Sequence, residues 1–550
     1  MKFKWQRVHG GKLQTPKKVQ SPSSKSGTCS ESQSGALGTA RPTVIGLVLA
    51  IWVAVSTFGL RAQETTNAAA AGASVDDIRV LRQKIDELER KVKELEDKNK
   101  PEAQTDKTKA RTDELEQKVK ILERSRELDV EAAEAKAKDA PKIAIGSDGF
   151  SFGNADGSYA LQLKGVLQID SRTFLHDSGI VGNDSLLLRR ARPILQGTVA
   201  RDFDFQFVPD FGGSSVQIFD AWLNYRFNPA LQLQAGKFKS PIGLEQLQAD
   251  ADLNFNERAL VTDLVPNRDI GFELHGELFG GVASYAAGIF NGVGDARNSS
   301  NFDFEDDKAF EGRVFFQPFK KTSIYALQGF GFGLGGSYEH MQKTNTTGLP
   351  ATTGGSLAGF VTDGQQQFFA YNPVSNAVVI ADGEHWRLSP QGYYYYGPFG
   401  FLGEYVISDQ RVTRALGTSR LSRRLENTAW EVTGSWILTG EDAAYKGGVV
   451  PRRPFDPLGG GWGAWQLVAR YAELNVDSDA FPLFANPGSS AKSAASWSVG
   501  LNWWLNRNVR LMTSFSHTDF RGGGGAGTSV PAAVTQKDEN LVFTRLQLAF

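Results

Sequence analysis

The sequence has almost no cysteine, no excess of either charge and only one long apolar run. The single cysteine, Cys29, excludes a disulfide framework, a cysteine-based zinc site and an iron–sulfur cluster. The 60 Lys and Arg residues balance 61 Asp and Glu, which removes the electrostatic case for a nucleic-acid-binding protein. The one apolar run covers residues 44–60, so a membrane protein built from several helices is also excluded.

Glycine and aromatic residues are what the 550-residue chain has in quantity. It contains 59 Gly, 36 Phe, 13 Tyr and 11 Trp. A long disordered chain would not carry so many aromatic side chains. The composition therefore favours a large β structure.

The amino end, residues 1–62, has the features of a targeting segment. Residues 1–40 are polar, and the apolar run that follows ends just before Arg61 and Ala62. This order is typical of a secretory signal peptide, here with a long extension before it and cleavage expected after Ala62. A single membrane anchor is the alternative, because an apolar run of about 17 residues is nearly long enough to cross a bilayer.

Residues 63–142 are predicted to hold a short coiled coil and a linker in the periplasm. Apolar residues alternate at spacings of three and four, between charged positions, at Ile78, Leu81, Ile85, Leu88, Val92 and Leu95. Such a seam favours self-association. Beyond Pro101 a weaker seam resumes at Leu115, Val119 and Leu122, before an Ala- and Lys-rich linker. A solvated single helix is the alternative, since few heptads are present.

From about residue 143 the apolar period changes to two, which predicts strands. In residues 217–227, for example, Leu223 and Tyr225 share one face while Asn224 and Arg226 share the other. About sixteen such segments, each about ten residues long, could cross a bilayer when tilted. Their expected starts are residues 159, 186, 203, 216, 230, 269, 282, 308, 329, 384, 399, 426, 463, 493, 508 and 539.

The connections between these segments alternate between short turns and long loops. The long loops cover residues 238–268, 340–383 and 519–538. This asymmetry is typical of an outer-membrane barrel. One long connection, 439–461, falls where a short turn is due, so it holds a further hairpin or folds into the lumen. A soluble sandwich or propeller is disfavoured, because its strands would be shorter or its motif would repeat. We predict an all-β transmembrane barrel of about 16 antiparallel strands over residues 143–550, preceded by the short coiled coil.

Several segments of this region resemble a known family, the phosphate-selective porins O and P. They include Leu187-Leu-Arg-Arg-Ala-Arg-Pro193, Asp220-Ala-Trp-Leu-Asn-Tyr-Arg-Phe227 and Leu264-Val-Pro-Asn-Arg-Asp-Ile-Gly271, together with residues 202–213, 236–239, 393–400, 460–465 and 501–509. The terminal Phe550 is also typical of bacterial outer-membrane barrels. The resemblance implies a sixteen-stranded homotrimeric channel in the outer membrane, narrowed by inward-folded loops and lined by Arg and Lys that attract inorganic phosphate.

Strand phase assigns each cation to the lumen or to the lipid side. We expect pore-lining, anion-binding guanidinium groups at Arg190, Arg192, Arg226, Arg313, Arg470, Arg510 and Arg545, and we expect Arg189 near a rim. Stacked arginines would give a descending oxyanion a file of fixed donors. Lys237 and Lys239 are the lysine candidates, and their alternative is a side chain that reaches the membrane headgroups.

Acidic residues share the same lumen and leave a second interpretation open. Lumen-facing carboxylates are expected at Asp220, Glu273, Glu277, Glu311 and Glu404. The loop 238–268, the expected constriction, contains Lys239, Arg258 and Arg268 but more carboxylates, at Glu245, Asp250, Asp252, Glu257 and Asp263. Paired charges of this kind would also suit a general, weakly selective porin.

We therefore predict a porin that lets anions, with inorganic phosphate or polyphosphate foremost, diffuse passively across the bacterial outer membrane. Its partners would be membrane lipids and small anions, with no nucleic acid, cofactor or metal. An enzyme is disfavoured, because the chain has six His and lacks the Gly-x-Ser-x-Gly context of a nucleophile. A barrel that only anchors a tether is a further alternative, which ion conduction would distinguish.

Overall fold

A computed structural model gives the fold and divides the chain into two units, residues 1–102 and 103–550. It describes residues 84, 86–91, 93–94 and 105–550, except 140, 176–183, 214, 300–305, 343–356, 358, 373–378, 417–418 and 523–537. The predicted signal peptide or anchor lies outside the described residues, as do all the predicted heptad positions before Pro101 except Leu88. No helix in the described ranges is both long enough and apolar enough to span a membrane.

The helical residues before the sheet are solvated wherever their side chains are described. Residues 84, 86–91 and 93–94 are helical, and α3 covers Thr105–Asp139. Helix α3 continues through the stretch expected to be a linker, because Ala, Lys and Glu are strong helix formers. Leu115, Val119 and Leu122 are exposed in this single chain, so the coiled coil stays a prediction.

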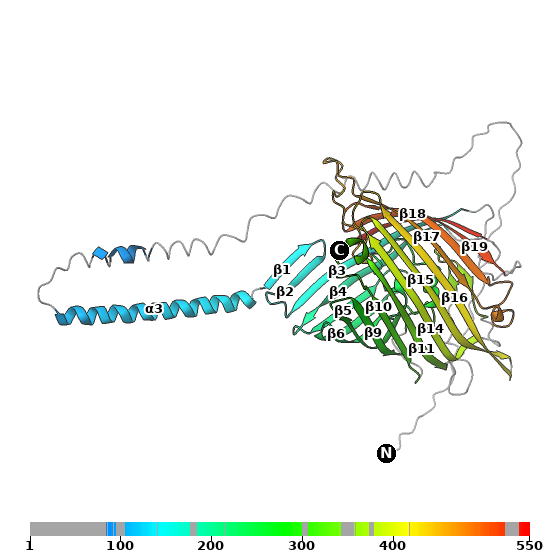
Figure 1. Ribbon diagram of the computed structural model, residues 1–550, viewed down its shortest axis with the longest axis horizontal. Helices are drawn as coiled ribbons and strands as arrows, with labels where there is room; N and C mark the ends of the chain where they lie inside the picture. The colour runs from blue at the N-terminus through cyan, green and yellow to red at the C-terminus, as the bar shows by residue number, and fades with distance from the viewer. Residues whose placement is uncertain are drawn as a thin grey trace, which may run out of the picture. The chain divides into compact units, whose positions relative to one another are not determined.

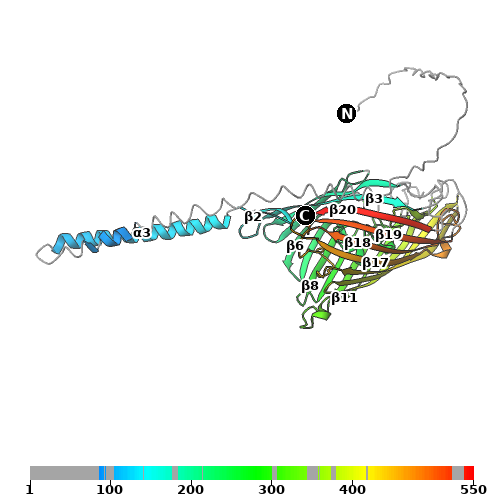
Figure 2. The ribbon, with the colours of Figure 1, turned by 90° about the horizontal axis from the view of Figure 1, so that it is seen from above.

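After α3, the second unit is dominated by one large antiparallel sheet, most of which closes into a barrel (Figures 1 and 2). The sheet has 18 strands, and all but β1 and β2 form the barrel wall, which leaves 16. The wall begins with β3 Ala160–Phe174, β4 Ser185–Val199, β5 Phe203–Asp210, β6 Gln217–Asn228, β7 Leu231–Lys239, β8 Arg268–Leu278, β9 Ala283–Phe290 and β10 Ala309–Phe316. It continues with β11 Phe330–Gln342, β14 Val379–Tyr396, β15 Phe399–Leu416, β16 Ser419–Ile437, β17 Ala464–Asn475, β18 Ser493–Trp504, β19 Val509–Arg521 and β20 Asp538–Ala549. Pairing of β20 with β3 closes the wall.

The sequence prediction of sixteen barrel strands is confirmed, and most strands start within one residue of the expected position. Strands β14 and β16 start earlier than expected, at Val379 and Ser419, because they extend well beyond the apolar alternation that marked them. The strand pair before the wall was not resolved in the sequence prediction. Strands β1 Pro141–Gly146 and β2 Gly149–Asn154 form a hairpin, and β2 pairs with the start of β3.

The long connections fold into the barrel and build its core there. The β7–β8 connection, residues 240–267, is called the lumen loop here and carries α4 Leu244–Leu247 and η1 Leu260–Leu264. The β11–β14 connection carries β12 Phe360–Val361 and β13 Gln367–Phe369, the β17–β18 connection carries η2 Ser478–Ala480, and α5 Tyr325–Gln328 lies between β10 and β11.

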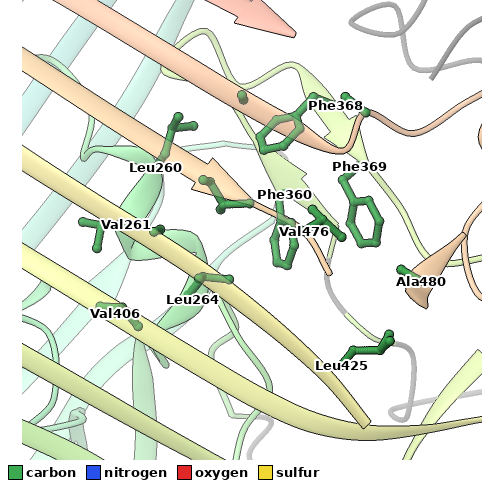
Figure 3. Packing of buried hydrophobic residues seen from close by; sticks show 14 of the residues in the cluster. Leu260, Val261, Leu264, Phe360, Phe368, Phe369, Val406, Leu425, Val476 and Ala480 are labelled. Carbon is green, nitrogen blue, oxygen red and sulfur yellow. The ribbon is translucent and has the colours of Figure 1, made fainter. Parts of the chain in front are cut away.

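These connections meet the wall in a buried cluster of apolar side chains, called the apolar plug (Figure 3). The lumen loop contributes Leu260, Val261 and Leu264, which Figure 3 shows beside Phe360, Phe368 and Phe369. Wall residues such as Val406 and Leu425 complete the cluster. Apolar burial is the main favourable term in folding. In this barrel, part of that burial occurs in the interior, between the inward-folded connections and the wall.

The long connection after β16 does not hold a further hairpin. Within residues 438–463 the only pairing is an isolated bridge between Asp456 and Gly461. Tyr445 Oη donates a hydrogen bond to the carbonyl oxygen of Leu244 at 2.7 Å. The segment therefore folds inward against the lumen loop, which decides between the two possibilities that the sequence left open.

Candidate functional site

The lumen loop crosses the barrel interior and is tied to the wall by arginines, called the arginine clamp. The clamp residues on the wall are Arg189, Arg190, Arg192, Arg470 and Arg545, and those on the loop are Glu245, Asp250 and Glu257. All except Arg189 are buried. A buried charge without a partner has a large free-energy cost. The ion pairs therefore hold the lumen loop at this position in the barrel.

Glu257 is the centre of the clamp. Its two carboxylate oxygens accept hydrogen bonds from Arg189 Nε at 2.7 Å and Nη2 at 3.0 Å. Arg545 Nη2 lies 2.8 Å from one of these oxygens and Arg190 Nη2 lies 3.5 Å from the other. Burial alone would raise the pKa of Glu257, but Arg189, Arg190 and Arg545 together hold that pKa well below its usual range.

Asp250 repeats this arrangement seven residues earlier in the chain. Arg192 forms an ion pair with it, Arg190 Nη2 lies at 3.5 Å and Arg258 Nη1 at 2.6 Å. Burial opposes ionisation of Asp250, yet Arg190, Arg258 and Arg192 keep its pKa well below the usual range. Both loop carboxylates are therefore firmly ionised and matched to the guanidinium groups around them.

Arginines on β17 and β19 also hold the loop, by binding its carboxylate and backbone carbonyl oxygens. Arg470 lies 3.3 Å from Glu245 and donates to the carbonyl oxygen of Glu257 at 3.0 Å. Arg510 donates to the carbonyl oxygens of Leu253 at 2.9 Å and Ala251 at 3.1 Å. These guanidinium groups therefore help to hold the lumen loop in position.

The position of Arg189 corrects a prediction. Sequence phase placed it near a rim, whereas the structure turns it inward onto Glu257. The ladder between β3 and β4 shifts between Gln168, which faces Arg190, and Ile169, which faces Leu188. Arg189 is the extra residue of this β-bulge, and a bulge redirects a side chain that simple alternation would place elsewhere.

The arginines that were expected to give an anion a file of donors are bound by groups of the protein itself. Arg190, Arg192, Arg470, Arg510 and Arg545 do lie inside the wall, as strand phase predicted. Their donors are taken up by the lumen loop, whose excess of carboxylates the sequence had already indicated. The partners Asp170, which pairs with Arg545 at 2.6 Å, and Asp210, which pairs with Arg192 at 2.6 Å, were not anticipated.

The predicted lumen carboxylates have different roles. Glu404 accepts the backbone N–H groups of Leu244 at 2.9 Å and Glu245 at 3.1 Å, and so seats helix α4. Asp220 lies 3.4 Å from Arg268. Glu311 is buried, and Glu273 and Glu277 line a cavity. On the opposite, apolar side of the lumen loop, burial raises the pKa of Asp263 well above its usual range.

A cavity of about 1010 Å³ lies between the lumen loop and the short-turn end of the barrel. Its lining reaches from Asp250 and Asp252 on the loop to the turn residues Pro229 and Asn508 and to Gly276 near the end of β8. Tyr445, stacked on Tyr393 with ring centroids 4.9 Å apart, forms part of this lining. The cavity is the water-accessible end of the lumen that the loop does not fill.

Four cations in this lining form no ion pair with any described carboxylate: Lys164, Lys239, Arg313 and Lys446. Lys239 Nζ donates to the carbonyl oxygen of Gln248 at 2.5 Å, and Arg313 Nε donates to the side-chain oxygen of Gln391 at 2.8 Å. Both of these contacts are with neutral oxygens rather than with carboxylates. Lys164 was not singled out in the sequence, although its phase on β3 places it inward.

The other two predicted cations lie elsewhere. Arg226 is at the mouth of the barrel, 42% exposed, and pairs with Asp204 at 3.0 Å. Lys237 is buried, and its Nζ donates to the carbonyl oxygen of Ser299 at 2.7 Å, so its ammonium group holds the loop after β9. Within the described part of the chain, no group of three or more His, Cys, Asp or Glu is arranged to hold a metal ion.

Comparison with known proteins gives matches along the whole barrel. Residues 161–550 match the family described as phosphate-selective porin O and P. Porin O of Pseudomonas aeruginosa is 25% identical over 394 residues, which cover 67% of this chain and 84% of that protein. Among solved structures, the outer membrane channel DcaP of Acinetobacter baumannii gives a TM-score of 0.44 at 12% identity, over 72% of this chain and 99% of DcaP. The outer membrane protein OmpT of Vibrio cholerae, in its trimer form, gives 0.43 at 12% identity, over 72% and 100%.

Proposed function

The chain belongs to the phosphate-selective porin O and P family and is a porin of the bacterial outer membrane, and we propose that it passes small anions by passive diffusion, with inorganic phosphate or polyphosphate as the preferred class. The observation that carries this proposal is the set of four cations in the cavity lining that have no described carboxylate partner. An anion that reaches this cavity meets basic side chains that are not already paired with carboxylates.

The proposed selective groups are Lys239 and Arg313, with Lys164 nearer the periplasmic mouth. A guanidinium group offers planar pairs of donors to an oxyanion, and an ammonium group offers a compact charge. Lys239 and Arg313 already donate to neutral oxygens, which fixes their position without cancelling their charge. A site made of a few such donors can bind an ion well enough to admit it and weakly enough to release it, as conduction requires.

The arginine clamp has a positioning role in this proposal. The clamp arginines, together with Arg510, hold the lumen loop, and the loop sets the width of the passage above the cavity. Their contribution to anion preference is indirect, because their donors already bind carboxylates and carbonyl oxygens.

A second candidate function is a general porin with weak selectivity. Asp252, Glu273 and Glu277 line the same cavity and form no ion pair with a described cation. Carboxylates in this position would attract cations and offset the field of Lys239 and Arg313. The two candidates therefore differ in the sign and size of charge selectivity.

The test is the reversal potential of the purified protein in a planar bilayer under a KCl gradient, followed by titration of the chloride current with phosphate. The proposal expects an anion-selective potential and a block at low phosphate. Replacing both residues, as Lys239→Gln with Arg313→Gln, should move the potential towards zero and weaken the block at least about tenfold, the effect of losing charge-assisted hydrogen bonds.

The controls separate charge from position. Arg313→Lys keeps the charge and should retain anion selectivity, while Arg226→Gln, at the exposed mouth, should leave block unchanged. A potential near zero or of cation-selective sign in the unmodified protein would favour the weakly selective porin. Absence of conduction would favour a barrel that only anchors a tether. A homotrimer, implied by the family resemblance, is part of the proposal and is checked by the mass of the native complex.

A further inference from the structure

The hairpin of β1 and β2 has one apolar and one polar face. Its register pairs Ile143 with Phe152 and Ile145 with Phe150, and directly opposed residues share a face of a sheet. All four side chains are exposed, Ile143 at 62% and Ile145 at 72%. The opposite face carries Lys142, Ala144 and Ser151. This alternation is what a strand shows when only one of its faces is covered by an apolar environment.

The apolar face continues the outer surface of the barrel. Phe150 pairs with Leu163 and Phe152 with Leu161, so the hairpin residues join the outward rows of β3. The same two rows run on through Leu195 to Phe207 and through Gly197 to Phe205. Because β-ladder partners share a face, the hairpin extends the surface that the wall presents to the membrane.

Polar contacts fix the hairpin at this place from its other side. Asp148 in the hairpin turn pairs with Arg507 at 2.7 Å, and Asn508 donates to the carbonyl oxygen of Ser147 at 2.6 Å. On the apolar side Phe150 meets the ring of Phe550, with centroids 6.3 Å apart. Figure 1 shows the hairpin beside the carboxyl terminus. The hairpin is therefore attached to the barrel, and no part of the chain that the structure describes covers its apolar face.

This face lies where the aromatic girdle of the barrel has a gap. Elsewhere the periplasmic strand ends carry paired aromatic rings, such as Phe203 with Tyr225, Phe399 with Trp436 and Trp465 with Trp503. At the seam, β19 begins with Val509 and the last pairs of β20 hold Leu546 and Leu548. The hairpin supplies Phe150 and Phe152 next to Phe550 at this seam. Girdles of this kind mark the boundary between hydrocarbon and headgroups.

We propose that the β1–β2 hairpin docks on phospholipid: its apolar face lies in the headgroup boundary of the periplasmic leaflet and completes the girdle where β20 meets β3. The occupant of the face is lipid because its residues lie in the same rows as membrane-facing residues of β3, β4 and β5. One pair of residues along a strand is about 7 Å, so Ile145 lies nearer the bilayer than Ile143.

The test places a fluorophore on either face of β1 in the full-length protein. In a Cys29→Ser background, the variants Ile145→Cys, Ile143→Cys and Ala144→Cys are labelled with an environment-sensitive probe. The folded proteins are then inserted into vesicles of phosphatidylethanolamine and phosphatidylglycerol, with or without lipids brominated near the glycerol end of the acyl chains. Ala144 is the matched control, since it is exposed on the same strand but faces the other way.

Docking on lipid predicts a graded result. Bromine should quench the probe at position 145 at least about twofold more than at 144, with position 143 in between, because quenching falls with distance from the interfacial zone. Equal, weak quenching at all three positions, with full reaction towards a water-soluble thiol reagent, would show that the face is in water and would overturn the proposal. Protection of 143 and 145 without quenching, together with disulfide cross-links between chains, would overturn it in favour of a second copy.

Discussion

The lumen loop is held in the barrel by two different kinds of contact on its two sides. On one side the arginine clamp fixes Asp250 and Glu257 by charge, and on the other Leu260, Val261 and Leu264 enter the apolar plug. Buried ion pairs recover little more than the desolvation they cost, whereas apolar burial is clearly favourable. The comparison indicates that the plug supplies most of the stability of the loop and that the clamp decides its position.

The two sides also differ in how their acidic residues respond to burial. In the clamp, guanidinium groups hold the pKa values of Asp250 and Glu257 well below their usual range. Beside the plug, burial raises the pKa of Asp263, which accepts one backbone hydrogen bond from Val361 at 2.8 Å. Charge is thus stabilised on one side of a single loop and disfavoured on the other.

The largest effect is expected from Glu257→Gln, which breaks the clamp at its centre. Four arginines, Arg172, Arg189, Arg190 and Arg545, would then lose a charge partner. Breaking a buried pair by removing one partner costs about 3–5 kcal/mol. We expect lower stability in urea unfolding of the vesicle-inserted protein, and noisier channel currents as the loop moves. Asp252→Asn is the control, because Asp252 only accepts a backbone hydrogen bond from Gly447 at 3.0 Å. Equal behaviour of the two variants would contradict the clamp.

Leu264→Ala opens a cavity in the apolar plug and should have the next largest effect. A buried leucine cut back to alanine costs about 2–5 kcal/mol, depending on how far the site collapses. Unlike the charge variant, this one should lower the free energy of unfolding by an amount that does not depend on pH. The matched change, Leu458→Ala, lies at a highly exposed position and should have little effect. If Leu264→Ala were equally harmless, the plug would not be the main source of stability.

Tyr445→Phe removes a single hydrogen bond between the segment 438–463 and the lumen loop. The loss should be about 0.5–1.5 kcal/mol, the usual net worth of one hydrogen bond. The ring and its stacking on Tyr393 are kept, so a small change in single-channel current is expected without loss of folding. A loss as large as that of Glu257→Gln would mean that this segment, rather than the clamp, positions the loop.

The smallest effect is expected from mild acid. A carboxylate whose pKa is depressed on folding adds stability that is present above its unfolded pKa, near 4, and is lost as pH falls through the lower folded value. The stability difference between the unmodified protein and Glu257→Gln should therefore be the same at pH 7 and at pH 5. It should shrink only well below about pH 4. A difference that already disappears at pH 5 would show that the clamp acids are not held in their ionised form.

The sequence predicted the wall far better than its contents. Strands follow from local alternation, so most of their starts were found to within one residue, and Arg190, Arg192 and Arg545 were placed correctly inside. Their partners could not be found in this way, because Arg545 and Glu257 are 288 residues apart. The sequence shows that the lumen loop has more carboxylates than cations, but only the fold shows that these carboxylates pair with arginines of the wall. The bulge at Arg189 shifts the alternation of inward and outward side chains, so this alternation placed Arg189 wrongly.

Arg545 belongs to the last strand, β20, and it joins Asp170 on the first wall strand to Glu257 on the lumen loop. A partly built barrel, whose final strand has not yet arrived, would offer Glu257 only the arginines of β3 and β4. The constriction can therefore reach its final form only in the step of assembly that closes the seam. Completion of the pore and completion of the wall are then one event, so a barrel left open at β20 would also be left without a finished channel.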